Sequence, residues 1–131
     1  MGRLEGKVAF LTGAGAGIAK ATALAYVREG AKVAIIELNK EAGTTAEKDV
    51  RAAGGDAIFI ETDVTKEDSV KRAVEATVAK FGTVNILLNC AGGSLQEDVP
   101  VHEMDIDIWH RTVALNMLHP FLTCKIGRAH V

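Results

Sequence analysis

The chain has 131 residues, of which 48% are hydrophobic and 24% charged, and its formal net charge is −2. This composition is typical of one globular domain or of part of one. It shows no cluster of basic residues that would bind nucleic acid, and no apolar run approaches the roughly 18 residues of a membrane span. We therefore expect the protein to bind neither nucleic acid nor a membrane.

The N-terminal pattern and the cysteines indicate a cytoplasmic protein. The chain leads from a short polar stretch straight into a strand-like run, unlike a signal peptide. Cys90 and Cys124 match no disulfide or metal spacing, and the four histidines show no ligand spacing with cysteines or acids. We therefore expect a reduced, cytoplasmic protein without a metal site.

Short apolar runs alternate with helical patterns along the chain. They predict strands at 7–12, 32–37, 57–62 and 84–89, and helices over 17–29, 40–53, 66–81 and from 105 onward. Gly30 and Gly82 stand where two of these helices end. Strands that are apolar on both faces and alternate with helices predict an α/β fold, a Rossmann-type doubly wound parallel sheet. The expected strand order is 3-2-1-4, which leaves the fourth strand as an open edge and an aggregation liability.

The first predicted strand runs into a glycine-rich stretch, TGAGAGIA (12–19), that opens a helix. Gly13, Gly15 and Gly17 would let the backbone approach a pyrophosphate. Free N–H groups and the dipole at the helix N-terminus would stabilise its charge. A merely tight turn is the alternative.

Glu37 ends the second predicted strand, 20 positions beyond Gly17. A carboxylate at this place can accept hydrogen bonds from a ribose diol and would repel a 2′-phosphate. Taken alone, Glu37 could equally be a solvated strand end. Together with the glycines, and without Arg or Lys in the glycine loop, it favours NAD over NADP as the cofactor.

Three motifs in order resemble the classical short-chain dehydrogenase/reductase family. They are TGAGAGI (12–18), DV (63–64) and NCAG (89–92), each directly after a predicted strand. The resemblance covers residues 4 to about 124, which we expect to be the N-terminal part of a single NAD(P)-binding Rossmann domain. Two positions depart from the family pattern. Ala19 replaces the last glycine of the glycine motif, and Cys90 replaces the second Asn of N-N-A-G.

The resemblance implies a role for each motif residue. The residues that would line the pyrophosphate are Gly13, Gly15, Gly17 and Ile18. Glu37 would hold the adenosine ribose, and the adenine would be flanked by Asp63 and Val64. The nicotinamide ribose would be flanked by Asn89, Ala91 and Gly92. Two alternatives stay open: Val64 could belong to the core, and Asp63 could be the N-cap of the helix over 66–81.

Asn116 lies inside the last predicted helix, where Asn is unfavourable. The resemblance implies a catalytic role, in which its main-chain carbonyl holds a water of the proton relay. Pro120, four residues on, has no N–H, so this carbonyl is left free and the helix should kink there. A polar residue on an interface-facing helix is the alternative.

The family's catalytic Ser and Tyr-x-x-x-Lys have no counterpart here, since the single tyrosine, Tyr26, is followed four residues on by Gly30. The resemblance thus implies the cofactor-binding half of an NAD(P)-dependent oxidoreductase, which transfers a hydride between nicotinamide and a small alcohol or carbonyl substrate. We expect this chain alone to be inactive and poorly soluble, and the parent enzyme to be a homo-oligomer, a dimer or a tetramer.

Two other functions compete with this interpretation. One is a non-catalytic dinucleotide-binding module. The other is a different Rossmann enzyme such as a methyltransferase, against which NCAG and Asn116 argue because neither has a role in methyl transfer. The substrate stays open, because the loop 92–104 would supply only one wall of its pocket.

The last seven residues, KIGRAHV (125–131), depart from the family pattern. From Ile126 the expected apolar helix face gives way to Gly127, Arg128 and His130. The seven residues are also what a common sequencing-library adapter encodes when it is read in frame. We therefore expect 125–131 not to be native sequence, with a genuine short C-terminus as the alternative.

Overall fold

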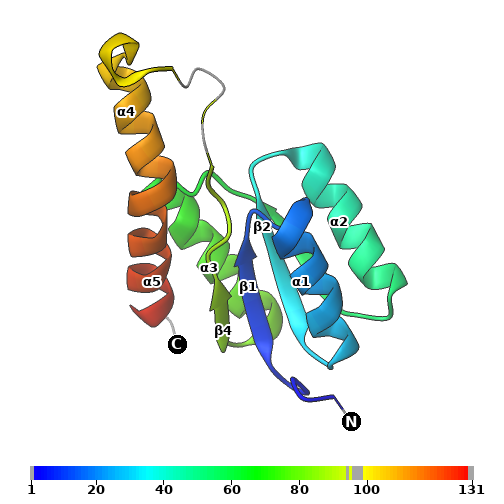
Figure 1. The fold of residues 1–131 in the computed structure, drawn as a ribbon. Helices are drawn as coiled ribbons and strands as arrows, with labels where there is room; N and C mark the ends of the chain where they lie inside the picture. The colour runs from blue at the N-terminus through cyan, green and yellow to red at the C-terminus, as the bar shows by residue number, and fades with distance from the viewer. Residues whose placement is uncertain (1, 94, 96–98, 130–131) are drawn as a thin grey trace.

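The computed structural model describes residues 2–93, 95 and 99–129. Strands and helices alternate as the sequence predicts, and the elements are β1 (Val8–Thr12), α1 (Gly17–Arg28), β2 (Lys32–Glu37), α2 (Lys40–Ala52), β3 (Ala57–Glu61), α3 (Glu67–Phe81), β4 (Ile86–Leu88), the 3₁₀ turn η1 (Val101–Glu103), α4 (Ile106–Val113), the π-helical turn η2 (Ala114–Leu118) and α5 (His119–Ala129). The four strands form one parallel sheet in the order β3-β2-β1-β4. The predicted Rossmann-type fold and strand order are confirmed (Figure 1).

Helices cover both faces of the sheet, with α1 and α2 on one side and α3 and α5 on the other (Figure 1). Because side chains alternate along a strand, β1 and β2 supply both cores. Leu11 and Ile35 pack under α1 and α2, whereas Phe10 and Ile36 pack under α3 and α5. The continuous apolar runs of these strands follow from burial on two faces.

Glycines end two helices, as the sequence predicts. Gly30 follows the C-cap residue of α1 with φ +92°, and Gly82 is itself the C-cap of α3 with φ +89°. A left-handed residue at this place turns the chain out of the helix, and glycine adopts that conformation without steric cost. Both glycines thus set where the next strand begins.

The helix that carries Asn116 is interrupted. Between α4 and α5, the turn η2 is π-helical rather than α-helical. Pro120 has no N–H for an α-helical bond to the Asn116 carbonyl, and π-helical turns are a known way to absorb such a break. At this place the structure shows a π-helical turn, and the expected kink stays a prediction.

The outer edge of β3 is capped by side chains from α2. Glu47 Oε2 accepts a hydrogen bond from the Phe59 N–H at 2.5 Å. Arg51 donates twice to the Ala57 carbonyl, from Nη2 at 2.8 Å and from Nε at 3.2 Å. These side chains take the place that a further strand would occupy, so this edge is closed to pairing.

The opposite edge, β4, borders a groove instead. A cavity of about 260 Å³ runs beside it, lined by Phe10, Val74, Val84, Asn85, Ile86, Leu87, Thr123, Cys124, Gly127 and Arg128. The predicted position of β4 at the edge of the sheet is confirmed. The strand itself is shorter than the predicted 84–89.

The apolar face of α5 extends to Ile126, which is buried in the core under α3. Residues 130 and 131 lie outside the described residues. The non-native origin of 125–131 stays a prediction. No helix in the described part of the chain is both long and apolar enough to cross a membrane.

Candidate functional site: a cavity at the carboxyl ends of the strands

A cavity of about 760 Å³ opens where the parallel strands end. It is lined by Gly13, Ile36, Glu37, Leu38, Thr62, Asp63, Val64, Thr65, Lys66, Cys90, Ala91, Gly92, Leu95, His110, Arg111, Ala114 and Leu115. In an open α/β sheet this is the place at which ligands bind, beside the point where the strand order reverses. The lining includes six of the predicted site residues, namely Gly13, Glu37, Asp63, Val64, Ala91 and Gly92.

The glycine loop lies between β1 and α1, with Gly13 against the chain that follows β4. Gly13 has φ +65°, and a Cβ built on it would lie 2.9 Å from the backbone of Ala91. Gly17, with φ +59°, is the first residue of α1. The conformation and the close approach both require glycine.

The N-terminus of α1 has no side-chain cap. Its N-cap residue is Ala16, which offers no side-chain acceptor to the first N–H groups of the helix. Ile18 stands in this first turn with 77% of its surface exposed. Uncapped N–H groups at a helix N-terminus suit a phosphate, so this turn fits the pyrophosphate of a dinucleotide.

The carboxylate of Glu37 lies over the glycine loop. Oε1 accepts from the Gly15 N–H at 3.0 Å, and Oε2 accepts from the N–H groups of Leu38 at 2.9 Å and Asn39 at 3.1 Å. Three N–H groups therefore hold the carboxylate of Glu37 on the wall of the cavity, and Glu37 is not a free strand end.

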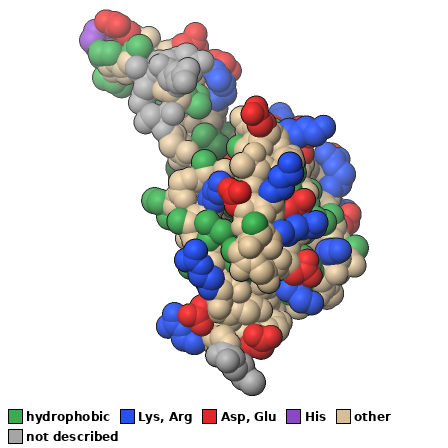
Figure 2. Space-filling view, turned by 90° about the vertical axis from the view of Figure 1, so that its right-hand side faces the viewer, with side chains coloured by type: hydrophobic (Ala, Val, Ile, Leu, Met, Phe, Trp, Pro, Cys, Tyr) green, Lys and Arg blue, Asp and Glu red, His purple; other side chains and the backbone are tan. Residues whose placement is uncertain are grey.

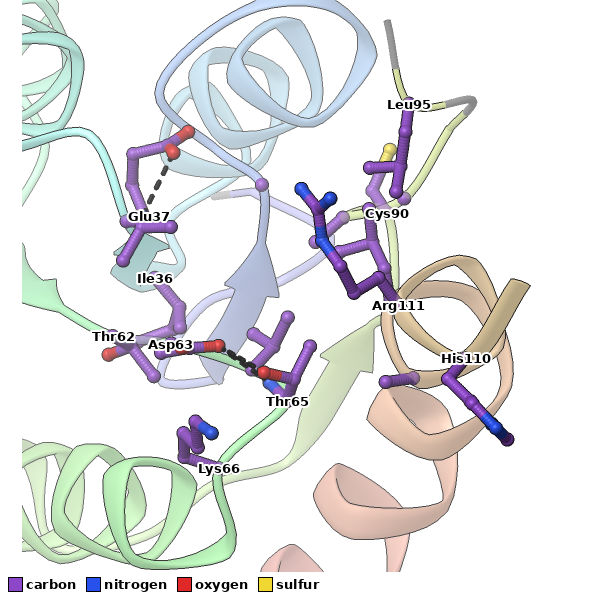
Figure 3. Close-up of a pocket in the computed structure, with 17 residues that line it drawn as sticks. Ile36, Glu37, Thr62, Asp63, Thr65, Lys66, Cys90, Leu95, His110 and Arg111 are labelled. Carbon is purple, nitrogen blue, oxygen red and sulfur yellow. Dashed lines mark hydrogen bonds between the residues drawn. The ribbon is translucent and has the colours of Figure 1, made fainter. Parts of the chain in front are cut away.

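Asp63 and Val64 follow β3 at the cavity floor. Asp63 Oδ1 accepts from the Thr65 N–H at 3.0 Å and from the Thr65 hydroxyl at 2.6 Å (Figure 3). The N-cap of α3 is Lys66, so the alternative of an N-cap role for Asp63 is wrong. Val64 is buried in the core under α3 and also lines the cavity, so both interpretations of Val64 hold.

Asn116 holds the chain that follows β4. Its Oδ1 accepts from the Gly93 N–H at 2.9 Å, and its Nδ2 donates to the carbonyls of Gly93 at 3.0 Å and Thr112 at 2.9 Å. A Cβ on Gly92 would lie 2.7 Å from Asn116 Oδ1, so glycine permits this contact. The side chain thereby fixes the chain that borders the cavity.

The side chain of Asn89 points toward α5 and not into the cavity. Its Oδ1 accepts from the Thr123 hydroxyl at 2.6 Å, and its Nδ2 donates to Cys124 Sγ at 3.8 Å. Contact of Asn89 with a ribose stays a prediction. Residues 94 and 96–98, part of the expected wall of the substrate pocket, lie outside the described residues.

Thr12 joins three segments beneath the cavity. Its buried Oγ1 accepts from the N–H groups of Cys90 at 2.9 Å and Ala91 at 3.2 Å, and lies 2.9 Å from His119 Nε2. Which of the two groups donates in the contact between Thr12 and His119 depends on the tautomer of the imidazole. The Leu88 carbonyl, at 3.4 Å, is a longer alternative acceptor.

His119 is almost fully buried, with 1% of its surface exposed. Burial lowers the pKa of its imidazole, and the carbonyl groups of Leu115 and Ala91 oppose that shift in part. Within the described residues, Nδ1 has no hydrogen-bond partner. Thr12 and His119 were not singled out from the sequence. The only signal was the place of Thr12 directly before Gly13, and nothing marked His119.

Two basic residues of the cavity were also not predicted from the sequence. Lys66 lines it from the start of α3, and Arg111 extends from α4 toward the carboxyl end of β1 (Figure 3). No sequence signal marks Arg111, because periodicity does not tell which side chain of a distant helix lines the cavity. Together with Glu37 and Asp63, these residues give the lining of the cavity both signs of charge.

The surface over α1 and α2 carries basic and acidic side chains interspersed, without a patch of one sign (Figure 2). In the part of the chain that the structure describes, no three His, Cys, Asp or Glu side chains come together as metal ligands would.

The family model of the short chain dehydrogenases matches residues 7–130. The chain belongs to this family. The match covers the glycine loop, the strand ends and Asn116. It excludes the alternative that the chain belongs to a methyltransferase.

Relatives of this short-chain dehydrogenase chain are oxidoreductases. It is 39% identical over 122 residues to an uncharacterised oxidoreductase of Thermotoga maritima, covering 93% of this chain and 47% of that protein. It is 41% identical over 127 residues to the 2,5-dichloro-2,5-cyclohexadiene-1,4-diol dehydrogenase LinX of Sphingobium indicum, covering 94% and 48%. The chain thus spans about half the length of these curated relatives.

Solved structures agree with the fold in detail. An NAD⁺-bound xylitol dehydrogenase superposes with a TM-score of 0.92 at 34% identity, covering 98% of this chain and 49% of that one. A 7α-hydroxysteroid dehydrogenase complexed with NADH and 7-oxo glycochenodeoxycholic acid gives 0.91 at 31% identity, covering 98% and 49%.

Proposed function

We propose that this chain is the cofactor-binding half of an NAD-dependent oxidoreductase that interconverts a small alcohol and its carbonyl form. The observation that carries the proposal is the Glu37 carboxylate, held over the glycine loop by the N–H groups of Gly15, Leu38 and Asn39. Its two oxygens suit a ribose diol, and its charge opposes a 2′-phosphate. Both solved relatives named above contain NAD⁺ or NADH.

The cavity fits a dinucleotide laid across the strand ends. Gly13, Gly15, Gly17 and Ile18 surround the uncapped turn of α1 that would hold the pyrophosphate. Asp63 and Val64 would flank the adenine, while Asn89, Ala91 and Gly92 would lie along the nicotinamide ribose. The bound nicotinamide supplies the hydride acceptor or donor, and residues of this chain bind and orient it.

Asn116 is the proposed catalytic residue of this half, through its main-chain carbonyl. Pro120 removes the α-helical donor for that carbonyl, and the π-helical turn widens the helix around it. A water held there would carry protons to and from the acid/base group. The hydrogen bonds of the Asn116 side chain to the Gly93 backbone hold Asn116 beside the chain that borders the cavity.

A non-catalytic dinucleotide-binding module is the second candidate, because the chain's only tyrosine cannot act at the site. Tyr26 lies in α1 and packs against the core on the α1–α2 side. We therefore expect residues 1–131 alone to show no turnover of NAD with any alcohol. Turnover by the purified chain would contradict this expectation.

The proposal extends to assembly and location. Trp109, Met117 and Phe121 are large apolar residues of α4, η2 and α5 that expose 54%, 69% and 58% of their surface. An exposed apolar helix face of this kind marks a protein interface, and we propose that a second copy of the protein covers it. Cys90 and Cys124 are unpaired, which supports a reduced cytoplasmic setting.

The cofactor proposal is tested by binding of NADH and NADPH to the full-length protein, followed by nicotinamide fluorescence. We expect tight binding of NADH and weak binding of NADPH. Glu37→Ala should weaken NADH binding about tenfold, the effect of losing a charged hydrogen-bonding group, and should leave NADPH binding unchanged or stronger.

The matched control is Glu61→Ala, which removes an exposed carboxylate at the end of β3 in register with Glu37. This variant should bind both dinucleotides as the unsubstituted protein does. Glu37→Gln keeps the shape of the side chain and separates charge from size. Unchanged discrimination in Glu37→Ala would count against Glu37 as the selector.

A further inference from the structure

The three glycines of the loop do not serve the same purpose. Gly13 and Gly17 have φ values of +65° and +59°, which favour glycine. Gly15 is not among the glycines with positive φ, so its backbone conformation is open to any residue. Conformation therefore does not explain why position 15 lacks a side chain.

The space beside Gly15 is filled by Glu37. A Cβ built on Gly15 would lie 2.5 Å from Glu37 Oε1, 2.7 Å from Cγ and 2.8 Å from Cδ. The Gly15 N–H donates to the same Oε1 at 3.0 Å. The missing side chain is what allows the carboxylate to approach the N–H group of Gly15.

Of the three N–H groups that hold Glu37, Gly15 alone comes from another segment. Leu38 and Asn39 follow Glu37 directly, so their bonds keep the carboxylate near its own strand end whatever the glycine loop does. The bond from Gly15 crosses from the β1–α1 loop to β2 and places Oε1 over the site proposed for the ribose.

We infer that Gly15 is a positioning residue for cofactor specificity: its N–H and its missing side chain set where the Glu37 carboxylate lies. Glu37 then meets the ribose diol of NAD and faces the 2′-phosphate of NADP at short range. This inference rests on the proposed function. It gives Gly15 a second role, at the ribose end of the cofactor, in addition to its place beside the pyrophosphate.

The test is Gly15→Ala in the full-length protein, with dissociation constants for NADH and NADPH measured by fluorescence. The three atoms nearest to the added methyl group all belong to the flexible side chain of Glu37, so Glu37 should move and the loop should keep its shape. We expect NADH binding to weaken about tenfold while NADPH binding does not weaken, because a charged hydrogen bond to one cofactor is lost. In a Glu37→Ala background, Gly15→Ala should cause no further change.

Gly17→Ala is the matched control within the same loop. Its Cβ would meet nothing within 4 Å, but its φ of +59° is strained for alanine. This variant should weaken NADH and NADPH alike and leave their ratio unchanged. Gly15→Ala would show the same pattern if Gly15 only shaped the loop, and that result would overturn the inference.

The remaining outcomes separate the inference from the function beneath it. If the unsubstituted protein binds NADH, but the effects of Gly15→Ala and Glu37→Ala on its dissociation constant multiply in the double variant, the two residues act independently. That result overturns the inference and leaves the proposed function standing. If the unsubstituted protein binds neither dinucleotide, the proposed function is wrong and the inference falls with it.

Discussion

Thr12 shows how much one hydroxyl group can organise below a binding site. It accepts from Cys90 and Ala91 and contacts His119, so it joins the ends of β1 and β4 to the start of α5. All of these contacts lie beneath the cavity wall formed by Cys90 and Ala91. A change at this hydroxyl removes contacts that hold the strand ends on which the proposed cofactor would rest.

The pH dependence of stability should report on His119. Burial lowers the pKa of this imidazole in the folded protein below its usual 6.5, so the unfolded chain binds a proton that the folded chain does not. The free energy of unfolding should therefore be constant above about pH 7.5 and should fall as the pH drops below 6.5, by at most about 1.4 kcal/mol per pH unit. Urea denaturation at several pH values measures this slope.

His119→Gln should flatten that slope between pH 7.5 and 5.5, whatever its effect on absolute stability. His110→Gln removes an exposed imidazole and should leave the slope as it was. A slope that survives His119→Gln would assign the effect to another group.

At the scale of the elements, the two edges of the sheet differ in what covers them. The β3 edge is capped by Glu47 and Arg51 from α2, whereas β4 borders a groove. Because unpaired strand edges promote association between chains, the caps should matter more for solubility than for stability.

The double variant Glu47→Ala, Arg51→Ala tests the edge cap. It leaves the Phe59 N–H and the Ala57 carbonyl without these partners, which should lower the free energy of unfolding by about 1–3 kcal/mol and speed aggregation on mild heating. Light scattering and urea denaturation measure the two effects. Lys48→Ala, an exposed residue of the same helix, is the control, and equal aggregation of both variants would contradict the role of the caps.

The elements were predictable because burial leaves a strong periodic signal. Runs such as VAFL at the start of β1 are apolar at every position, since helices cover both faces of the sheet. The short β4 and the π-helical turn η2 were not predicted in form. The length of β4 depends on its pairing with β1, and a wider turn has the same local composition as an α-helix.

At the scale of the whole molecule, the exposed face of α4, η2 and α5 should govern assembly. Phe121→Glu places a charge on this face, which should shift the full-length protein toward a smaller oligomer. Light scattering coupled to size exclusion measures the mass. Lys48→Glu, a charge change on α2, is the control, and an unchanged mass of Phe121→Glu would argue against this interface.

The candidate site was predictable in part, because parallel strands bring their carboxyl ends to one edge. This rule alone unites Gly13, Glu37, Asp63 and Ala91 from four separate motifs. It says nothing of residues that reach the cavity from helices, such as Arg111, or of the buried contact between Thr12 and His119. Those depend on how α4 and α5 cross the sheet, which periodicity does not encode.

The caps on β3 also bear on the order in which the chain folds during synthesis. Glu47 lies 12 residues from Phe59, and Arg51 lies 6 from Ala57, so both caps form within one short stretch of chain. The pairing of β4 with β1, by contrast, joins Ala9 to Ile86. A nascent chain leaving the ribosome can close its β3 edge before β4 has emerged, and the growing sheet then accepts new strands from one side only.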